Sequence, residues 1–343
     1  LMSFVLIVFW ALTFVNILGV KTSAWFSSFC TVFGLFVPMV LIVSMGVIWV
    51  LTGHKAQVAL NSHTLWPQFN HLSIWVTMQG VILSLCGIEL ATVHACDVKN
   101  PQKSFPKALI VSVIIILITL IMGSLSIAFI VPHAQIENGL VTGIVYAFDL
   151  FLTNMHMHWM LPVIGVMLAI GALGGVNSWI LAPARGLYFA TKDGHLPEYF
   201  AKENEHGSPV SILIMQAILV SILMIVFFLI PSVNGAYWLI SVLAGQIYAL
   251  MYMIMFSAAI VISLRHKKEA LDYRVSRKIG GMLGISILGL IGSSVAFLVC
   301  FIPPEQVPIG NREHYEVLLI GSLLVLVFLP LIFRIKRRKT KGS

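Results

Sequence analysis

Apolar segments recur along the whole chain and alternate with short polar connections. Nine of them are long enough to cross a bilayer as helices: 3–20, 29–51, 74–96, 108–131, 160–184, 210–230, 237–264, 282–302 and 317–333. Lipid offers no partner for backbone polar groups, so a spanning segment must be a helix or part of a closed barrel. Barrel strands would instead alternate in polarity over about ten residues. The pattern therefore predicts an all-α polytopic membrane protein with nine spans.

The connections between these spans are too short to hold a soluble domain. The longest is under about 30 residues, whereas compact domains start near 50. Within it, the apolar segment 139–155 is short and polar enough to be predicted as a helix at the membrane interface. Composition agrees, since 59 % of the 343 residues are hydrophobic and 10 % charged, against about 25 % charged in soluble domains. We therefore expect a single transmembrane domain over 1–343, and a soluble globular protein is excluded.

The formal net charge of +8 reflects membrane topology and not a nucleic-acid site. When the connections are assigned alternately to the two faces, all of the 21 Lys and Arg residues except Lys55 and Arg312 fall on one face. Basic residues accumulate in cytoplasmic loops. This predicts a multi-pass protein of the cell inner (plasma) membrane with its basic tail, 334–343, in the cytoplasm.

The same topology places Leu1 on the outer side of the membrane. Residues 1–20 contain neither a basic leader nor a small-residue cleavage site that would carry a free N-terminus across. Our interpretation is that an odd number of spans has been lost upstream of Leu1.

The cysteine and histidine patterns predict neither a disulfide framework nor a metal site. The four cysteines, at 30, 86, 96 and 300, are scattered through or beside the spans, which is typical of buried free thiols. His156 and His158 form a pair without a third ligand, and this is a weak zinc signal. We expect no metal and no cofactor.

Two spans are rich in glycine. The third contains Gly80 and Gly87, and the fifth contains Gly165, Gly171, Gly174 and Gly175, then Asn177, Ser178 and Trp179, with an expected end at Pro183. Glycines at this density permit either close helix packing or a break in the helix. Composition alone favours packing.

Glu89 is the one Asp, Glu, Lys or Arg within the nine spans. An ionised group of this kind costs about 2.5–3.5 kcal/mol at the helix centre on insertion scales, so it normally faces a partner or a wet cavity. It could brace the helices by accepting hydrogen bonds from backbone N–H groups, or it could lie on a substrate or proton path. Gly87, just before it, is a place where the helix could open and expose backbone groups to a ligand. His94 would not share a helix face with Glu89 and is interpreted as an interfacial residue.

Two long motifs carry a family resemblance: GIELATVHACDVKNPQKSFPKA at 87–108 and SWILAPARGLYFATKDGHLPEYFAKENEHGSPV at 178–210. They resemble the amino acid–polyamine–organocation transporter superfamily. Within it, the chain is most similar to bacterial glutamate/GABA antiporters, including YALMY at 248–252 and FIPPE at 301–305. The similarity extends over essentially the whole chain.

The resemblance implies a transporter fold of twelve helices, with a five-plus-five inverted repeat and two additional helices. The nine spans would be helices four to twelve, so three would be missing. The second repeat would cover about 74–264, and the additional helices about 282–333. Alternating access would work around a broken helix at Gly87.

The resemblance also implies a set of substrate-binding or gating residues: Ser84, Cys86, Gly87 and Glu89 in the broken stretch, Trp179, Tyr248 and Tyr252. Two positions depart from the pattern. Leu83 stands where arginine/agmatine relatives have a gating tryptophan, and Gly175 stands where glutamate/GABA exchangers have an acidic residue. The tail 334–343 ends without the folded plug of those antiporters, so acid gating is not implied.

The predicted function is amino acid transport by exchange, with glutamate and GABA as the leading substrate pair and no enzymatic chemistry. The expected partners are a small amino acid and the lipid bilayer, with no nucleic acid, and the oligomeric state is left open. The alternatives are a truncated, non-transporting membrane remnant and a transporter of a different amino acid or polyamine. A channel is disfavoured because rings of pore-lining polar residues are not evident in the sequence.

Overall fold

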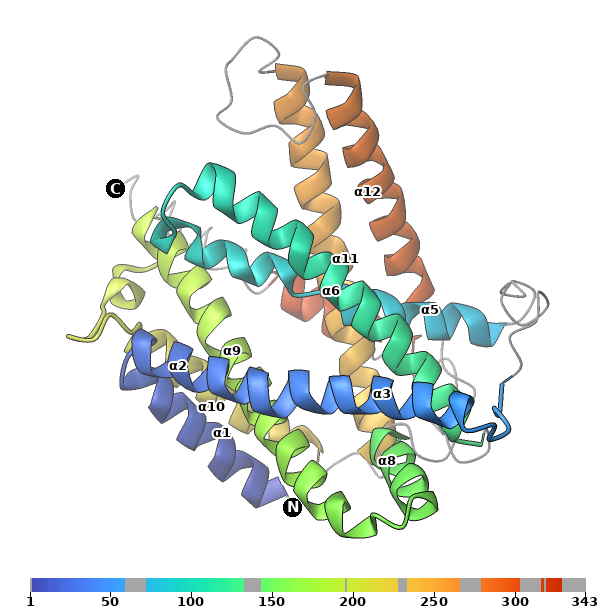
Figure 1. Cartoon of the computed structure of the whole chain (residues 1–343). Coiled ribbons are helices and arrows are strands. Elements are labelled where there is room, and N and C mark those ends of the chain that lie inside the picture. Colours follow the sequence, from blue (N-terminus) through green and yellow to red (C-terminus); the bar gives the residue numbers. More distant parts are fainter. Residues whose placement is uncertain are drawn as a thin grey trace, which may run out of the picture. The chain divides into compact units, whose positions relative to one another are not determined.

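A computed structural model describes residues 2–58, 72–132, 143–194, 196–227, 233–265, 279–302, 316–317 and 319–328. Within these ranges the chain forms helices joined by turns, without strands (Figure 1). The α-helices are α1 (Met2–Ile17), α2 (Val20–Thr31), α3 (Val37–Leu51), α5 (Leu72–Leu85), α6 (Pro101–Ile130), α8 (Gly143–Asn154), α9 (Leu161–Lys192), α10 (Val210–Phe227), α11 (Val233–Arg265) and α12 (Ile279–Val299). Four further helical segments are the π helix η1 (Val32–Phe36) and the 3₁₀ helices η2 (Ile88–Asp97), η3 (His158–Met160) and η4 (Glu198–Ala201).

Helix length and composition confirm the prediction of an all-α polytopic membrane protein. Five described helical segments are long and apolar enough to cross a membrane: Val20–Leu51, Pro101–Ile130, His158–Lys192, Tyr237–Arg265 and Ile279–Val299. Four shorter apolar stretches are Ser3–Ile17, Gly80–Ala95, Val210–Met224 and Leu319–Phe328. Together they coincide with the nine apolar segments of the sequence. The assignment of these helices to an inverted repeat, with helices missing upstream, stays a prediction.

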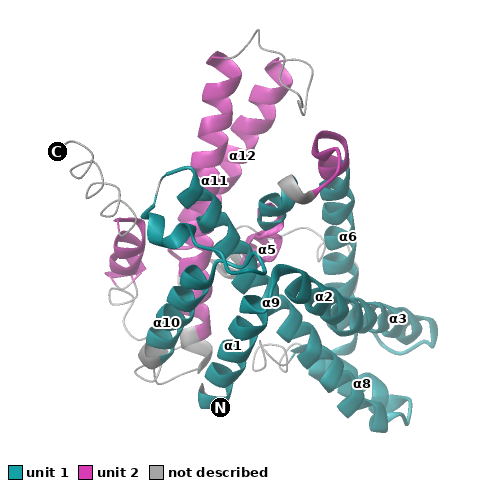
Figure 2. Cartoon of the chain, turned by 90° about the vertical axis from the view of Figure 1, so that its left-hand side faces the viewer, with its two compact units in different colours: residues 1–66, 90–96, 107–225 teal, residues 67–89, 97–106, 226–343 magenta. Residues whose placement is uncertain are grey.

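The chain divides into two compact units, each built from discontinuous segments (Figure 2). Unit 1 comprises Leu1–Trp66, Leu90–Cys96 and Lys107–Ile225, and unit 2 comprises Pro67–Glu89, Asp97–Pro106 and Val226–Ser343. The boundary therefore falls inside the third predicted span, directly after Glu89. The two halves of this span belong to different units.

In unit 1, α2, η1 and α3 follow one another as a single long rod that crosses α9 (Figure 1). The crossing is very close: a Cβ added to Gly171 would lie 2.2 Å from the carbonyl oxygen of Gly34, and one added to Gly174 would lie 2.3 Å from Cβ of Cys30. The wide π turn η1 lies at this crossing and ends just before Pro38, which has no N–H to donate to Gly34. Packing at glycines, favoured from the sequence, is confirmed for α9.

The prediction that the fifth span ends at Pro183 is wrong. Helix α9 continues through Pro183 to Lys192, a total of 32 residues. Ile180, Leu181 and Ala184 on either side of the proline are buried, so packing holds the helix where one N–H donor is missing. Membrane helices tolerate proline when neighbouring helices compensate in this way.

The segment expected at the membrane interface forms the short helix α8. Its apolar face is buried within unit 1, where Phe148 is fully buried and the rings of Phe151 and Trp49 lie 6.2 Å apart. This face belongs to a core cluster shared with residues of α3, α6 and α9. The helix is therefore an integral part of unit 1.

In unit 2, α11 and α12 run side by side (Figure 1). They meet so closely that a Cβ added to Gly289 would lie 2.4 Å from the ring of Phe256. Val242, Cys300 and Leu319 form the buried core of this unit, and α5 packs against both helices. This arrangement places the first half of the broken span beside α11.

Candidate functional site

The third predicted span is broken at Gly87. Helix α5 ends at Leu85, Cys86 and Gly87 form a turn, and the 3₁₀ helix η2 begins at Ile88. The φ angle of Gly87 is +103°, a conformation in which glycine alone avoids a steric penalty. The break that the resemblance implied is therefore present, and its position follows from this one residue. Packing, which composition alone favoured for this span as well, is not the role of Gly87. The 3₁₀ segment after it is ten residues long, whereas runs beyond about 3–4 residues are uncommon and often mark hinges.

The carboxylate of Glu89 holds the broken turn together. Its Oε2 atom accepts a hydrogen bond from the backbone N–H of Gly87 at 3.1 Å. The same oxygen accepts a hydrogen bond from the hydroxyl of Tyr252 on α11. An N–H that has no partner in a continuing helix is costly inside a membrane, and here a side chain of the same turn satisfies it. The bracing interpretation of Glu89 thus has direct structural support.

Two tyrosines of α11 stand beside this turn in unit 2. Tyr248 and Tyr252 are one helical turn apart, and their ring centres lie 6.2 Å apart at 43°. Both are partly buried, and Tyr252 makes the contact with Glu89. The carboxylate, the freed backbone amide and the phenol form a small polar cluster where α5 ends beside α11.

The remaining predicted residues are arranged differently. Cys86 donates its thiol to the carbonyl of Ile82 at 3.3 Å, and its backbone N–H bonds to Leu83 at 3.1 Å, so it closes the last turn of α5. Ser84 is exposed and donates to the carbonyl of Val81 at 2.6 Å. Six of the seven predicted site residues thus lie in unit 2, either at the break or on α11.

Trp179, the seventh predicted site residue, lies on α9 in unit 1. Its side chain is 45 % exposed, whereas Asn177 two residues earlier is fully buried. Gly175, one of the two positions at which the sequence departs from the resemblance, has open space around its Cβ direction. The exposed face of α9 at this level therefore contains a tryptophan beside an unfilled position.

A closed ring of hydrogen bonds in unit 1 was not predicted from the sequence. Asn16 donates to Oδ1 of Asn177 at 2.8 Å, Asn177 donates to Oγ of Ser23 at 2.8 Å, and Ser23 donates to Oδ1 of Asn16 at 2.7 Å. All three residues are fully buried. The second amide hydrogens reach the carbonyl of Leu12 and the hydroxyl of Ser27, so the ring is satisfied. Two asparagines inside apolar segments were the available signal.

Two further polar side chains, Gln246 and Arg185, were also not predicted from the sequence as making notable contacts. Gln246 on α11 is fully buried, and neither atom of its amide has a hydrogen-bond partner within the described ranges. Arg185 on α9 places Nη1 2.7 Å from Nδ1 of His94, so His94 contacts protein and is more than an interfacial residue. Nε2 of His158 lies 3.1 Å from Oδ1 of Asp149, and the side chain of His158 is more exposed than that of Asp149.

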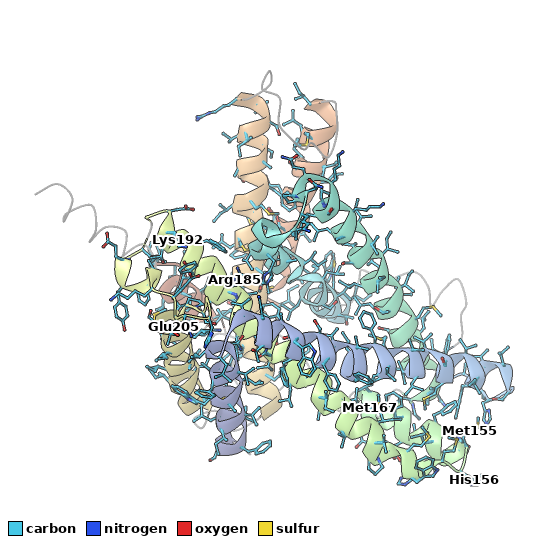
Figure 3. All side chains as sticks on the ribbon, turned by 60° about the vertical axis from the view of Figure 1, so that its left-hand side comes forward. Met155, His156, Met167, Arg185, Lys192 and Glu205 are labelled. Atoms are coloured by element: carbon cyan, nitrogen blue, oxygen red, sulfur yellow. The ribbon has the colours of Figure 1, made fainter. Side chains whose placement is uncertain are left out.

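Figure 3 shows the polarity of unit 1 along α9. Arg185, Lys192 and Glu205 lie toward one end, and Met155 and His156 lie at the other. The three labelled charged residues thus lie toward the end that the sequence assigns to the cytoplasm.

Among the described residues, His, Cys, Asp and Glu do not gather into a group of three that could hold a metal ion.

Discontinuous helices are a typical construction of the substrate sites of secondary transporters. Residues 1–328 match the amino acid permease family, and the chain belongs to this family of membrane transporters, which are not enzymes. It is 38 % identical over 337 residues to an uncharacterized transporter of Legionella pneumophila, covering 97 % of this chain and 71 % of that protein.

The chain is also similar to two glutamate/gamma-aminobutyrate antiporters of Lactococcus lactis. It is 28 % identical to that of subspecies lactis and 29 % identical to that of subspecies cremoris. Each comparison covers 95 % of this chain and 65 % of the antiporter. The chain thus spans less than two thirds of the length of these two relatives.

Proposed function

We propose that the protein exchanges amino acids across the bacterial inner membrane, with glutamate and GABA as the leading substrate pair. The observation that carries the proposal is the break at Gly87, where Glu89 accepts hydrogen bonds from a backbone amide and from Tyr252. Transporters of several families bind substrate carboxylates at such interrupted helices, because the freed N–H groups and the helix dipole favour a negative charge.

In this proposal Glu89 takes the place of a substrate carboxylate in the resting state. Its Oε2 atom uses the N–H of Gly87, a donor that an incoming amino acid would also use. Proton uptake by Glu89 would weaken both of its contacts and release Gly87 and Tyr252 for the substrate. Substrate entry and proton binding would then be coupled at one carboxylate.

The unit boundary supports alternating access around this turn. The chain passes from unit 2 to unit 1 directly after Glu89, two residues beyond the glycine with positive φ. A turn that absorbs a change in φ and ψ can act as a hinge between two packed bodies. The first half of the span would stay with α11, while the second half would stay with α9.

The substrate pair is the finer part of the proposal. It is supported by the names of the two antiporters at 28 % and 29 % identity. Gly175 and Leu83 depart from the residues implied by the resemblance. Glycine at 175 leaves open space where the resemblance implies an acidic side chain, so a site on this face would have a different charge and a larger volume. Trp179, on the same exposed face of α9, is proposed to contact substrate. A different amino acid or a polyamine is the alternative substrate class.

An exchange assay tests the proposal. The full native chain would be reconstituted in liposomes loaded with glutamate, and entry of labelled GABA would be followed in parallel with labelled arginine, agmatine and alanine. GABA entry that depends on internal glutamate supports the pair, and entry of another compound identifies a different substrate. No exchange with any of them would instead support the non-transporting remnant.

The substitution Glu89→Gln tests the role of the carboxylate while the rest of the turn stays unchanged. The amide keeps an acceptor oxygen for Gly87 and Tyr252 but cannot take up a proton. We expect expression to be preserved and the pH dependence of exchange between about pH 5 and 8 to flatten, because an amide cannot transfer a proton with the substrate. An unchanged pH profile would exclude the coupling role of Glu89.

A further inference from the structure

A second contact, separate from those of Glu89, holds the later half of the broken span. Within unit 1, Nη1 of Arg185 on α9 lies 2.7 Å from Nδ1 of His94 on η2. One residue further along α9, a Cβ added to Gly186 would lie 3.5 Å from the side chain of Val93, so the two elements are in van der Waals contact here. The guanidinium of Arg185 also lies 5.7 Å from the ring centre of Phe189 on its own helix.

The chemistry of the two side chains fixes the state of the imidazole. A guanidinium has five N–H donors and no acceptor, and it stays protonated in proteins. Nδ1 of His94 must therefore accept the hydrogen bond, which places the ring hydrogen on Nε2. A protonated imidazole would present an N–H to an N–H and a positive charge to a positive charge at this distance. The contact exists only with neutral His94.

The other charged groups of these two elements make contacts of their own. On η2, Glu89 bonds with Gly87 and Tyr252, and the side chain of Asp97 lies outside the described residues. On α9, the ammonium of Lys192 lies 4.6 Å from the ring centre of Tyr188. Glu203, which follows η4, interacts electrostatically with the same lysine and tyrosine. Arg185 is thus a charged group that directly faces His94 in unit 1.

We propose that Arg185 is a positioning residue that fastens the second half of the broken span to α9 through His94, and that the fastening opens when His94 takes up a proton. Imidazoles commonly change charge between pH 5 and 8. The contact lies toward the end of α9 that carries Lys192 (Figure 3), which the charge distribution assigns to the cytoplasm. Acidification of the cytoplasm would release residues 90–96 from α9. Its effect on transport rests on the proposed function, whereas the contact itself does not.

Hydrogen exchange on the intact protein measures the fastening without any transport. The full chain in lipid nanodiscs would be compared at about pH 5.5 and 7.5, a range that spans imidazole titration, and the exchange of the 88–97 peptide would be corrected for intrinsic rates. In the wild type, we expect protection of this peptide to fall about tenfold at the lower pH, the size that loss of one charge-assisted hydrogen bond implies.

Two substitutions at position 94 set the limits of this response. His94→Asn places an amide oxygen near the position of Nδ1 without a titratable group, so protection should stay high at both pH values. His94→Leu removes the acceptor, so protection should stay low at both. Arg185→Gln keeps a donor but removes the charge, and it should reduce the pH step without abolishing protection.

Two results would overturn the proposal: a wild-type peptide equally protected at both pH values, or a pH step that persists in His94→Leu. Assays of amino acid exchange on the same proteins then report on function. A wild type with the expected protection step but no amino acid exchange would refute the proposed function and leave the fastening intact. Amino acid exchange without the protection step would refute the fastening and leave the proposed function intact.

Discussion

The broken span and helix α9 are both rich in glycine, yet the first is interrupted and the second runs unbroken over 32 residues. In the broken span, Gly87 adopts a φ of +103° that other residues avoid. In α9, Gly171 and Gly174 keep helical geometry and let the rod of α2, η1 and α3 approach to backbone distance. Glycine thus serves a turn in one helix and a helix crossing in the other. The physical difference is whether the missing Cβ relieves a dihedral angle or a contact between neighbours.

The largest expected effect comes from filling the helix crossing. In Gly171→Ala, the new Cβ would lie 2.2 Å from a backbone oxygen of Gly34, so one of the two helices must shift. Overpacking of this kind costs about 1–3 kcal/mol and occasionally more, and we expect a clear fall in the melting temperature in detergent.

Gly175→Ala is the matched control on the same helix. Its Cβ direction is open, and replacing a helical glycine with alanine gains about 0.5–1 kcal/mol. If both variants melted at the same temperature, the close crossing at Gly171 would be refuted.

The next effect is expected at the turn. Gly87→Ala forces a side chain into a backbone conformation that costs about 1–3 kcal/mol, and it should impair exchange more than it lowers stability because the turn also presents the N–H bonded to Glu89. Gly80→Ala, within α5 and with open space around it, should leave exchange intact. Equal exchange rates in the two variants would show that the turn has no special role.

The smallest effect concerns the phenol that contacts the turn. Tyr252→Phe removes the hydroxyl donated to Glu89, a loss of about 1 kcal/mol for an ordinary hydrogen bond. Exchange should slow, with a changed pH dependence. Tyr248→Phe leaves that bond in place and serves as the control one turn away. A larger defect in Tyr248→Phe would move the functional contact from Tyr252 to its neighbour.

Much of the fold could be predicted because hydrophobic length is a local property. The nine apolar segments all recur as helical stretches. Gly87 was a place where one of them could open, although composition alone favoured packing. The error at Pro183 has the opposite origin. Proline predicts a stop from local chemistry, but neighbours buried around it hold α9 together. A local rule fails where packing supplies what the backbone lacks.

The site was predicted only in part for the same reason. Glu89 was evident because an ionisable group within an apolar segment is costly wherever it lies. The resemblance named Tyr252 as a residue of the transport path, but not its bond to Glu89. The asparagine ring and Gln246 were missed because an uncharged polar residue within a span is informative only when its partner is known. The Arg185 contact was missed because Arg185 lies just beyond the predicted span.

The sequence by itself determined that this chain is a helical membrane protein with one intramembrane carboxylate beside a weak point in a helix, because lipid forces every backbone amide to find a partner within its own segment. Only the tertiary structure decided which polar groups meet. Glu89 and Tyr252 are 163 residues apart, Asn16 and Asn177 are 161 apart, and His94 and Arg185 are 91 apart. Hydrogen bonds form over about 3 Å, so the choice among distant partners depends on how the helices pack.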